Sequence, residues 1–170
     1  MHRSLRYRIT RAGEGTWVLQ SDVASLEWVD HADSRMPQVT DLRHTVLMAP
    51  FGVKRDENWG DEDPHSHHLL ALEGGRVVGY SRLIDDGTSA QIRQVAVAFE
   101  RQRAGVGRAL MLETLRRADA LGLAPVFLHA RLSAVGFYER FGFAVVSDDP
   151  FPYGRTGLPH VRMELREPQR

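Results

Sequence analysis

The chain has 170 residues, the length of one domain with at most a short extension. Its 22 basic and 22 acidic residues cancel with histidine neutral, so it lacks the net-basic composition of a nucleic-acid-binding protein. No apolar run is long enough for a transmembrane helix, and no apolar stretch follows the basic N-terminus as in a secretory signal. Cysteine is absent, which excludes disulfide scaffolds, thiolate zinc sites and a cysteine nucleophile, and makes the cytoplasm the expected location.

The first two dozen residues have a weak pattern. Tyr7 and Ile9, then Trp17 to Leu19, favour either two short strands around a Gly13-Glu14-Gly15 turn or a loosely attached arm. We expect residues 1–24 to be an extension outside the main fold and residues 25–170 to form the main domain.

The next elements are read from apolar periodicity and turn residues. A strand is expected at 26–29, then a helix from about Pro37 with Val39, Leu42 and Val46 on one face, and a long loop over 49–66. The Gly74-Gly75 turn indicates a hairpin between strands at 68–72 and 77–80, and a third strand follows at 92–97.

The period then changes to that of a helix over 106–121, which Gly122 ends. Its expected buried face holds Leu110, Met111, Thr114, Leu115, Ala118 and Leu121, and its expected solvent face holds Glu113, Arg116 and Arg117.

The last third alternates strand and helix. Strands are expected at 126–128, 143–146 and 161–165, with a loop over 148–159. A short helix ending at Gly142 would be capped by Ser133 and would bury Ala134, Phe137 and Phe141. The order predicts a mixed α/β fold.

Residues 95–108 carry the clearest chemical signal, because they run strand, glycine turn, helix. A helix N-terminus offers unpaired N–H groups and a positive dipole end, and Gly105 and Gly107 let the backbone approach an anion such as a pyrophosphate. Arg101, Arg103 and Arg108 would add positive charge; the alternative is an ordinary helix start with solvated arginines. A P-loop is excluded because no lysine follows, and a dinucleotide fingerprint because residue 110 is leucine.

Gln102 to Gly107 fit the pattern Gln/Arg-x-x-Gly-x-Gly/Ala, and Phe137-Tyr138-Glu139-Arg140-Phe141-Gly142-Phe143 follows further along. Together these motifs resemble the GNAT superfamily of acyl-CoA N-acyltransferases. Further residues resemble its ElaA-like branch: Leu42-Arg43 with Val46, Asp61-Glu62-Asp63, His68-Leu69, Tyr80-Ser81-Arg82, and Leu158-Pro159-His160 with Met163. The resemblance covers about residues 26–165; Arg103 stands where glycine is frequent, and Arg131 where many relatives have asparagine.

The resemblance implies a three-layer α/β fold, with a mixed, mostly antiparallel sheet splayed between its fourth and fifth strands and flanked by helices. Acetyl-CoA would be the acyl donor, with its pantetheine in the splay and its diphosphate on the N–H groups of residues 103–108. A main-chain N–H near Val97 would polarise the thioester carbonyl. The implied cofactor-binding residues are Val95, Ala96, Val97, Gln102, Arg103, Ala104, Gly105, Val106, Gly107 and Arg108.

The implied reaction is acetyl transfer to a primary amine of a small molecule, or less favourably of a protein, by direct attack in a ternary complex. Tyr138 is the candidate acid for the leaving thiolate by its place in the motif, although a tyrosine beside Phe137 and Phe141, taken in isolation, favours a half-buried packing residue. His160 and His129 are the candidate bases; Glu100, the Asp61-Glu62-Asp63 cluster and a water chain remain alternatives.

Other readings stay open. Trp59, Phe151 and Tyr153 would line an acceptor pocket or close off core edges. No metal site is assigned, because His65, His67 and His68 match no ligand template and a strand would turn His67 and His68 to opposite faces. The alternative function is a non-catalytic acyl-CoA-binding sensor, and a third is an interaction domain that binds no CoA. No nucleic-acid or membrane partner is expected, and a homodimer is left open.

Overall fold

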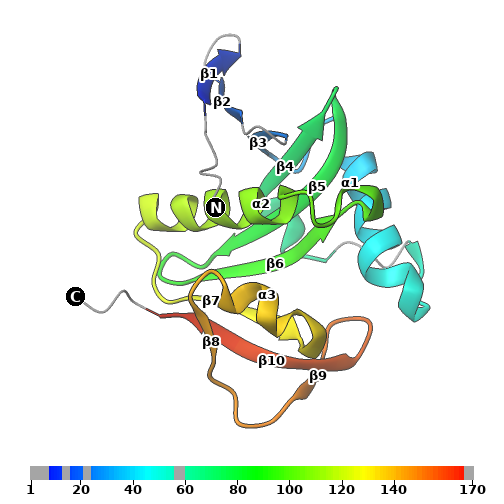
Figure 1. The fold of residues 1–170 in the computed structure, drawn as a ribbon, viewed down its shortest axis with the longest axis vertical. Helices are drawn as coiled ribbons and strands as arrows, with labels where there is room; N and C mark the ends of the chain where they lie inside the picture. Colours follow the sequence, from blue (N-terminus) through cyan, green and yellow to red (C-terminus); the bar gives the residue numbers. More distant parts are fainter. Residues whose placement is uncertain (1–7, 13–15, 21–23, 56–59, 167–170) are drawn as a thin grey trace.

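The computed structural model describes residues 8–12, 16–20, 24–55 and 60–166 (Figure 1). Its strands form one ten-stranded sheet in the order β1-β2-β3-β4-β5-β6-β7-β10-β8, with β9 paired to β10. The strands are β1 Arg8–Ala12, β2 Thr16–Gln20, β3 Ser25–Val29, β4 His67–Glu73, β5 Arg76–Asp85, β6 Ala90–Val97, β7 Val126–Arg131, β8 Phe143–Val145, β9 Phe151–Tyr153 and β10 Leu158–Leu165.

Three α-helices accompany the sheet in the described part of the chain: α1 Met36–Arg43, α2 Val106–Ala120 and α3 Val135–Glu139. A π-helical turn, η1 His44–Met48, continues α1, and short 3₁₀ turns are η2 Ala49–Phe51, η4 Asp63–His65, η5 Phe99–Arg101 and η6 Leu132–Ala134.

The sheet opens between β6 and β7, its only parallel pair among the described strands. The two strands pair only from Ala90 to Ile92 against Val126 to Leu128 and then separate. β6 also bulges, since its register against β5 shifts between Tyr80 and Arg82 and Gln94 has a φ of +54°. Counted from β3, these are the fourth and fifth strands, so the expected splayed α/β fold is confirmed.

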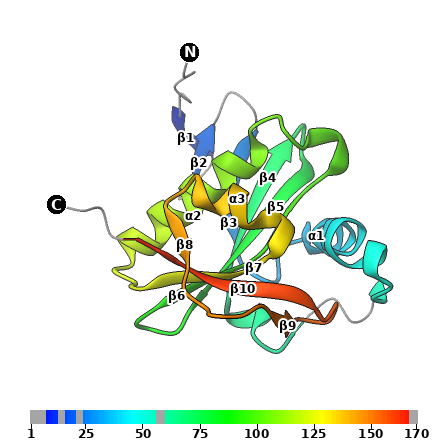
Figure 2. The ribbon, with the colours of Figure 1, turned by 60° about the horizontal axis from the view of Figure 1, so that its bottom comes forward.

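Alternation along the strands gives the sheet two apolar faces. On one face, Leu70, Tyr80 and Ala96 pack with Val39 and Leu42 of α1. On the other face, Leu69, Ala71 and Val78 pack with Val106, Ala109 and Leu110 of α2. Figure 2 shows α1 on one side of the sheet, away from α2 and α3.

β1 and β2 form an antiparallel pair, and β2 joins β3 through Leu19↔Leu26 and Gln20↔Ser25. The N-terminal strands therefore lie at the edge of the sheet beyond β3 (Figure 1). Tyr7 and the Gly13-Glu14-Gly15 turn lie outside the described residues. The division of the chain at residue 24 stays a prediction.

The predicted solvent face of α2 is wrong at Glu113, and its predicted buried face is wrong at Leu121. Glu113 is 3% exposed because its Oε1 accepts a hydrogen bond of 2.8 Å from Nε1 of Trp28 in β3. Arg116 donates to the same carboxylate. Leu121 is 43% exposed, since the helix ends at Ala120. A helix periodicity cannot reveal a buried partner that lies 85 residues away.

Two further local predictions are wrong. Ser133 does not cap α3; it lies in η6, and Ala134 occupies the N-cap position without a side-chain cap bond. The loop expected over 148–159 contains a short strand, β9, because Phe151 to Tyr153 pair with the start of β10.

Candidate active site

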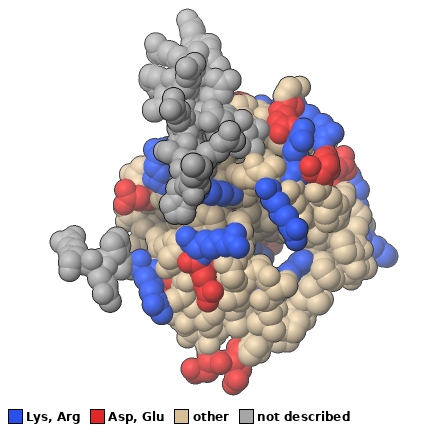
Figure 3. Space-filling model, viewed as in Figure 1, with Lys and Arg blue, Asp and Glu red and all other residues tan. Residues whose placement is uncertain are grey.

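A cleft of about 750 Å³ lies where β6 and β7 separate. The space-filling view of Figure 3 shows a hollow in the molecule with basic side chains on its rim. The cleft is lined from α1, η1, β5, β6, β7, α3 and the turn between β9 and β10; its polar side chains are Arg43, Glu62, Asp63, Arg82, Arg93, Gln94, Gln102, His129, Arg131, Ser133, Tyr138, Tyr153, Arg155, Thr156 and His160.

The three candidate catalytic side chains meet in this cleft. Tyr138, His129 and His160 all line it, as do two of the implied cofactor-binding residues, Val95 and Gln102. The other implied cofactor-binding residues do not line it: Ala96, Val97, Arg103, Ala104, Gly105, Val106, Gly107 and Arg108.

The turn before α2 leaves its backbone donors available. Arg103 and Gly105 have φ of +64° and +90°, and α2 begins with the hydrogen bond from Ala109 N to Gly105 O at 3.0 Å. In the described structure, no carbonyl or side chain accepts from the N–H groups of residues 103–108. Such a helix start is a site for an anion.

Side chains fix this turn to β6 and to the hairpin beside it. Nε2 of Gln102 donates to the carbonyl O of Val97 at 3.1 Å. Arg101 is held by Glu73 at 2.7 Å, so Arg103 and Arg108 are the exposed cations at the turn outside this ion pair.

His160 is the third residue of β10 and has the tautomer of a base. Its Nδ1 donates to the carbonyl O of Leu158 at 2.6 Å, because a carbonyl can only accept. Nε2 therefore carries the lone pair. Burial lowers the pKa of His160, an effect that the Leu158 carbonyl opposes and Arg131 reinforces. The imidazole is consequently neutral at pH 7.

His129 lies in an aromatic enclosure on β7. Its ring centroid is 4.3 Å from that of Tyr153 and 5.2 Å from that of Phe151, both at near-perpendicular angles. Burial lowers its pKa, and the charges of Arg162 and Arg93 lower it further. Its Nδ1 is buried without a hydrogen-bond partner among the described residues.

Tyr138 is placed by α3 beside the splayed strands. Its ring packs against Phe137 and Phe143, with centroid distances of 5.0 and 6.2 Å. Burial raises the pKa of Tyr138 to about 12, and Arg131 opposes that rise. The phenol is therefore protonated at neutral pH, as a proton donor must be.

The carboxylate alternatives are occupied by arginines. Glu100 pairs with Arg76 and does not line the cleft. Glu62 pairs with Arg82 and Arg93, and its own backbone N–H and these charges lower its pKa, which makes it a weak base.

His67 and His68, the first two residues of β4, lie in different environments. His67 lies 3.7 Å from Asp85, whereas the fully buried His68 donates from Nε2 to the carbonyl O of Asp63 and accepts from the hydroxyl of Tyr80. Over residues 24–55 and 60–166, no group of three or more histidine, aspartate or glutamate side chains is arranged to hold a metal ion.

Comparisons with known proteins identify the family. Residues 52–167 match the model of the acetyltransferase (GNAT) domain. The chain belongs to the GNAT acetyltransferase family. Within the described residues, no helix is long and apolar enough to cross a membrane.

Three GNAT proteins show the extent of the match. The chain is 28% identical over 123 residues to the uncharacterized N-acetyltransferase YjcF of Bacillus subtilis, covering 72% of this chain and 86% of that one. It is 28% identical over 148 residues to ElaA of Escherichia coli, covering 81% and 95%. The crystal structure of an acyl-CoA N-acyltransferase from Pseudomonas aeruginosa aligns with a TM-score of 0.65 and 27% identity, covering 83% and 99%. The expected resemblance to ElaA is confirmed, and the protein is an enzyme of the N-acetyltransferase class.

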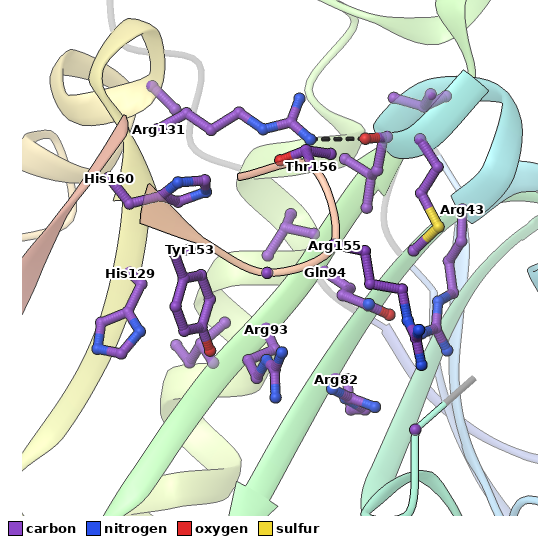
Figure 4. A pocket seen from close by; sticks show the side chains of 18 of the residues that line it. Arg43, Arg82, Arg93, Gln94, His129, Arg131, Tyr153, Arg155, Thr156 and His160 are labelled. Atoms are coloured by element: carbon purple, nitrogen blue, oxygen red, sulfur yellow. Dashed lines mark hydrogen bonds between the residues drawn. The ribbon is translucent and has the colours of Figure 1, made fainter. Parts of the chain in front are cut away.

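Several charged residues of this GNAT site were not assigned a role from the sequence. Arg43, Arg82, Arg93 and Arg155 line one end of the cleft, and Figure 4 shows them apart from His129 and His160. Arg43 in α1 and Arg82 in β5 belong to the segments that resemble ElaA, and that resemblance was the signal that could have pointed to them.

Arg131 crosses the cleft at the end of β7. Its Nη2 donates to the carbonyl O of Leu47 at 2.6 Å (Figure 4). Its guanidinium lies 4.4 Å from the ring centre of Phe51. It thus ties η1 and η2 to the strand opposite β6, which a shorter asparagine at this position has less reach to do.

Of the three loop aromatics, Tyr153 lines the cleft and Phe151 packs against His129. Trp59 lies outside the described residues. The side of the cleft next to β9 therefore carries aromatic side chains.

Proposed function

We propose that the protein transfers an acetyl group from acetyl-CoA to a primary amine of a small molecule. The observation that carries this proposal is the splay of β6 from β7, with an open turn at the start of α2 on one side and a neutral histidine and a protonated tyrosine inside the cleft. A cleft of about 750 Å³ is the size of a small-molecule site, which favours a small amine over a protein amine.

The acyl donor would enter through the splay. Residues 103–108 offer unpaired N–H groups to the diphosphate, and Arg103 and Arg108 add charge. The pantetheine would lie along Val95 as an added strand does. The carbonyl O of Val97 already accepts from Gln102, so at Val97 we expect contacts to use the N–H group.

A second groove of about 550 Å³ runs between α2 and α3 next to this turn. Its walls are Leu112, Leu115, Phe137 and Phe141, and Arg108 and Arg140 stand at its rim. Apolar walls with flanking guanidinium groups suit a flat base and a phosphate, so we assign the nucleotide end of CoA to this groove.

The acceptor would approach from the α1 side. Along β7, Leu128 and Ala130 join the core under α2, so His129 and Arg131 face the opposite side by strand alternation. An amine entering there meets His129 and His160 before it meets the thioester.

The chemistry needs three proton transfers. A primary amine with a pKa of about 10 is mostly protonated at pH 7, so Nε2 of His160 takes one proton and later releases it to solvent. The neutral amine nitrogen then bonds to the thioester carbonyl carbon, the C–S bond breaks, and the thiolate takes the proton of the Tyr138 hydroxyl. The tyrosinate regains its proton from the new amide nitrogen, which still carries one proton too many. The chain has no cysteine that could form an acyl-enzyme, which favours direct transfer in a ternary complex.

Calorimetry with acetyl-CoA, followed by a thiol-release assay over a panel of primary amines, tests this proposal. We expect saturable binding and amine-dependent release of CoA. Binding without thiol release from any amine would contradict the transfer reaction and favour a sensor of acyl-CoA.

A further inference from the structure

One end of the cleft carries an excess of positive charge. Among the described residues that line the cleft, five guanidinium groups stand against two carboxylates, and His129 and His160 add no charge because burial lowers their pKa values. Figure 4 shows four of these arginines grouped at the end away from His129 and His160: Arg43, Arg82, Arg93 and Arg155.

The two carboxylates are each shared between two arginines. Asp63 accepts from Arg43 and Arg82, and all three side chains are at most 1% exposed. Glu62 accepts from Arg82 and from Arg93. Neither carboxylate is left to neutralise a further cation, so the network of three arginines retains a positive charge at the cleft.

Unsatisfied polar atoms accompany this charge. Nε of Arg82 is buried without a hydrogen-bond partner among the described residues, and so is Oε1 of Gln94. Gln94 lies in the bulge of β6 at a φ of +54°, where a non-glycine residue is strained. A buried N–H without an acceptor is costly, and an oxygen of an anionic ligand in the cleft would accept from Nε of Arg82. Oε1 of Gln94 only accepts hydrogen bonds, so it would need a donor of the ligand, such as an amine N–H.

Arg93 is the member of the network best placed to meet a ligand. Its side chain is 24% exposed, and its guanidinium lies 5.3 Å from the ring centre of Tyr153. The same tyrosine ring is 5.3 Å from the ring of His160. One aromatic ring therefore separates the positive end of the cleft from the candidate base.

We infer that the acceptor carries a carboxylate or a phosphate besides its amine, and that Arg93 binds this anion so that the amine reaches His160 and the thioester. The inference rests on the proposed function and names its substrate class. An amino acid and an aminoalkyl phosphate share the required chemistry, because guanidinium groups bind both anions through paired N–H donors.

The test compares acceptors in matched pairs that differ only in the anion: glycine with glycinamide, leucine with leucinamide, and phosphoethanolamine with ethanolamine. With the full chain and acetyl-CoA, we expect kcat/KM for thiol release to be about tenfold or more higher for the anionic member of at least one pair. The first two pairs report a carboxylate site and the third a phosphate site. The amides have the lower amine pKa, so intrinsic reactivity works against the expected result.

A substitution at Arg93 tests whether this residue causes the preference for anionic acceptors. Arg93→Gln should lower the ratio of kcat/KM for the preferred anionic acceptor to kcat/KM for its neutral partner about tenfold, with little change in KM for acetyl-CoA. Arg55→Gln is the matched control, because Arg55 pairs with Asp41 on the surface and does not line the cleft.

A binding measurement separates failure of this inference from failure of the proposed function. Each acceptor is titrated by calorimetry into the protein saturated with CoA. Binding of an anionic acceptor that Arg93→Gln weakens, without thiol release, would uphold the anion site and contradict the transfer reaction. Thiol release that is equally efficient with both members of every pair, and insensitive to Arg93→Gln, would uphold the transfer and overturn the anion site.

Discussion

Nδ1 of His160 donates a hydrogen bond of 2.6 Å to the carbonyl oxygen of Leu158. Because these two residues are the first and the third of β10, the backbone itself fixes the tautomer of the imidazole. The lone pair is left on Nε2, and burial lowers the pKa of the ring so that this lone pair is present at neutral pH.

The first prediction concerns this histidine. Since the base must be neutral, kcat/KM should fall as the pH drops through a pKa below the ordinary 6.5 of histidine. His160→Ala should lower kcat by about 10²–10⁴ and remove this acidic limb, as seen in a pH–rate series. His129→Ala is the comparison, because its ring shares the cleft but its Nδ1 has no such carbonyl. An acidic limb that persists in His160→Ala and vanishes in His129→Ala would reassign the base.

Tyr138→Phe should lower kcat by about 10²–10⁴ and leave the affinity for acetyl-CoA unchanged, because the hydroxyl acts only on the departing thiolate. The pKa of about 12 also predicts no alkaline limb from this group below that pH. Steady-state kinetics with calorimetry measures both quantities. A variant with the kcat of the parent would remove Tyr138 from the mechanism.

The backbone of Arg103 gives a prediction about the anion-binding turn. Its φ of +64° is costly for a β-branched residue and free of strain for glycine. Arg103→Val should therefore weaken CoA binding more than Arg103→Gly, although both remove the same charge. Calorimetry with CoA compares the two; equal affinities would show that the left-handed conformation is not needed for binding.

Gly79 lies where β5 packs tightly against α2. A Cβ at this position would lie 2.8 Å from Cγ1 of Val106 and 3.0 Å from Cδ1 of Leu110. Gly79→Ala should cost about 1–3 kcal/mol in the free energy of unfolding, measured by urea denaturation.

Gly136→Ala is the matched control for that substitution. Gly136 lies in α3 with no atom within 4 Å of an added Cβ, so alanine there should be neutral or stabilise by up to about 1 kcal/mol. A Gly79→Ala protein as stable as Gly136→Ala would show that α2 can move away from the sheet at no cost.

The elements that the sequence predicted well are those whose signals are local. The Gly74-Gly75 turn has φ of +55° and +79°, which only glycine adopts readily, and it joins β4 to β5 as expected. The stop at Gly122 is likewise local, with a φ of +67°. The splay between β6 and β7 came from the family resemblance and not from a pattern in the residues.

The parts of the site that sequence reasoning missed depend on contacts across long separations. The Arg43–Asp63–Arg82 network joins α1, η4 and β5, and each of these residues looks like a surface charge in its own segment. The bulge at Gln94 depends on the register of β6 against β5, which no periodicity of β6 reveals. Both features depend on contacts between segments that are far apart in the sequence. The net charge of the cleft therefore could not be predicted from the amino-acid composition.

Titration of the purified protein with CoA in a calorimeter tests the central claim most directly. The account predicts saturable binding with a Kd well below about 1 mM, carried by the N–H groups of residues 103–108. No heat of binding at millimolar CoA would contradict a CoA site at the N–H groups of residues 103–108. The assignment of the cleft as an acetyl-transfer site would then also be wrong.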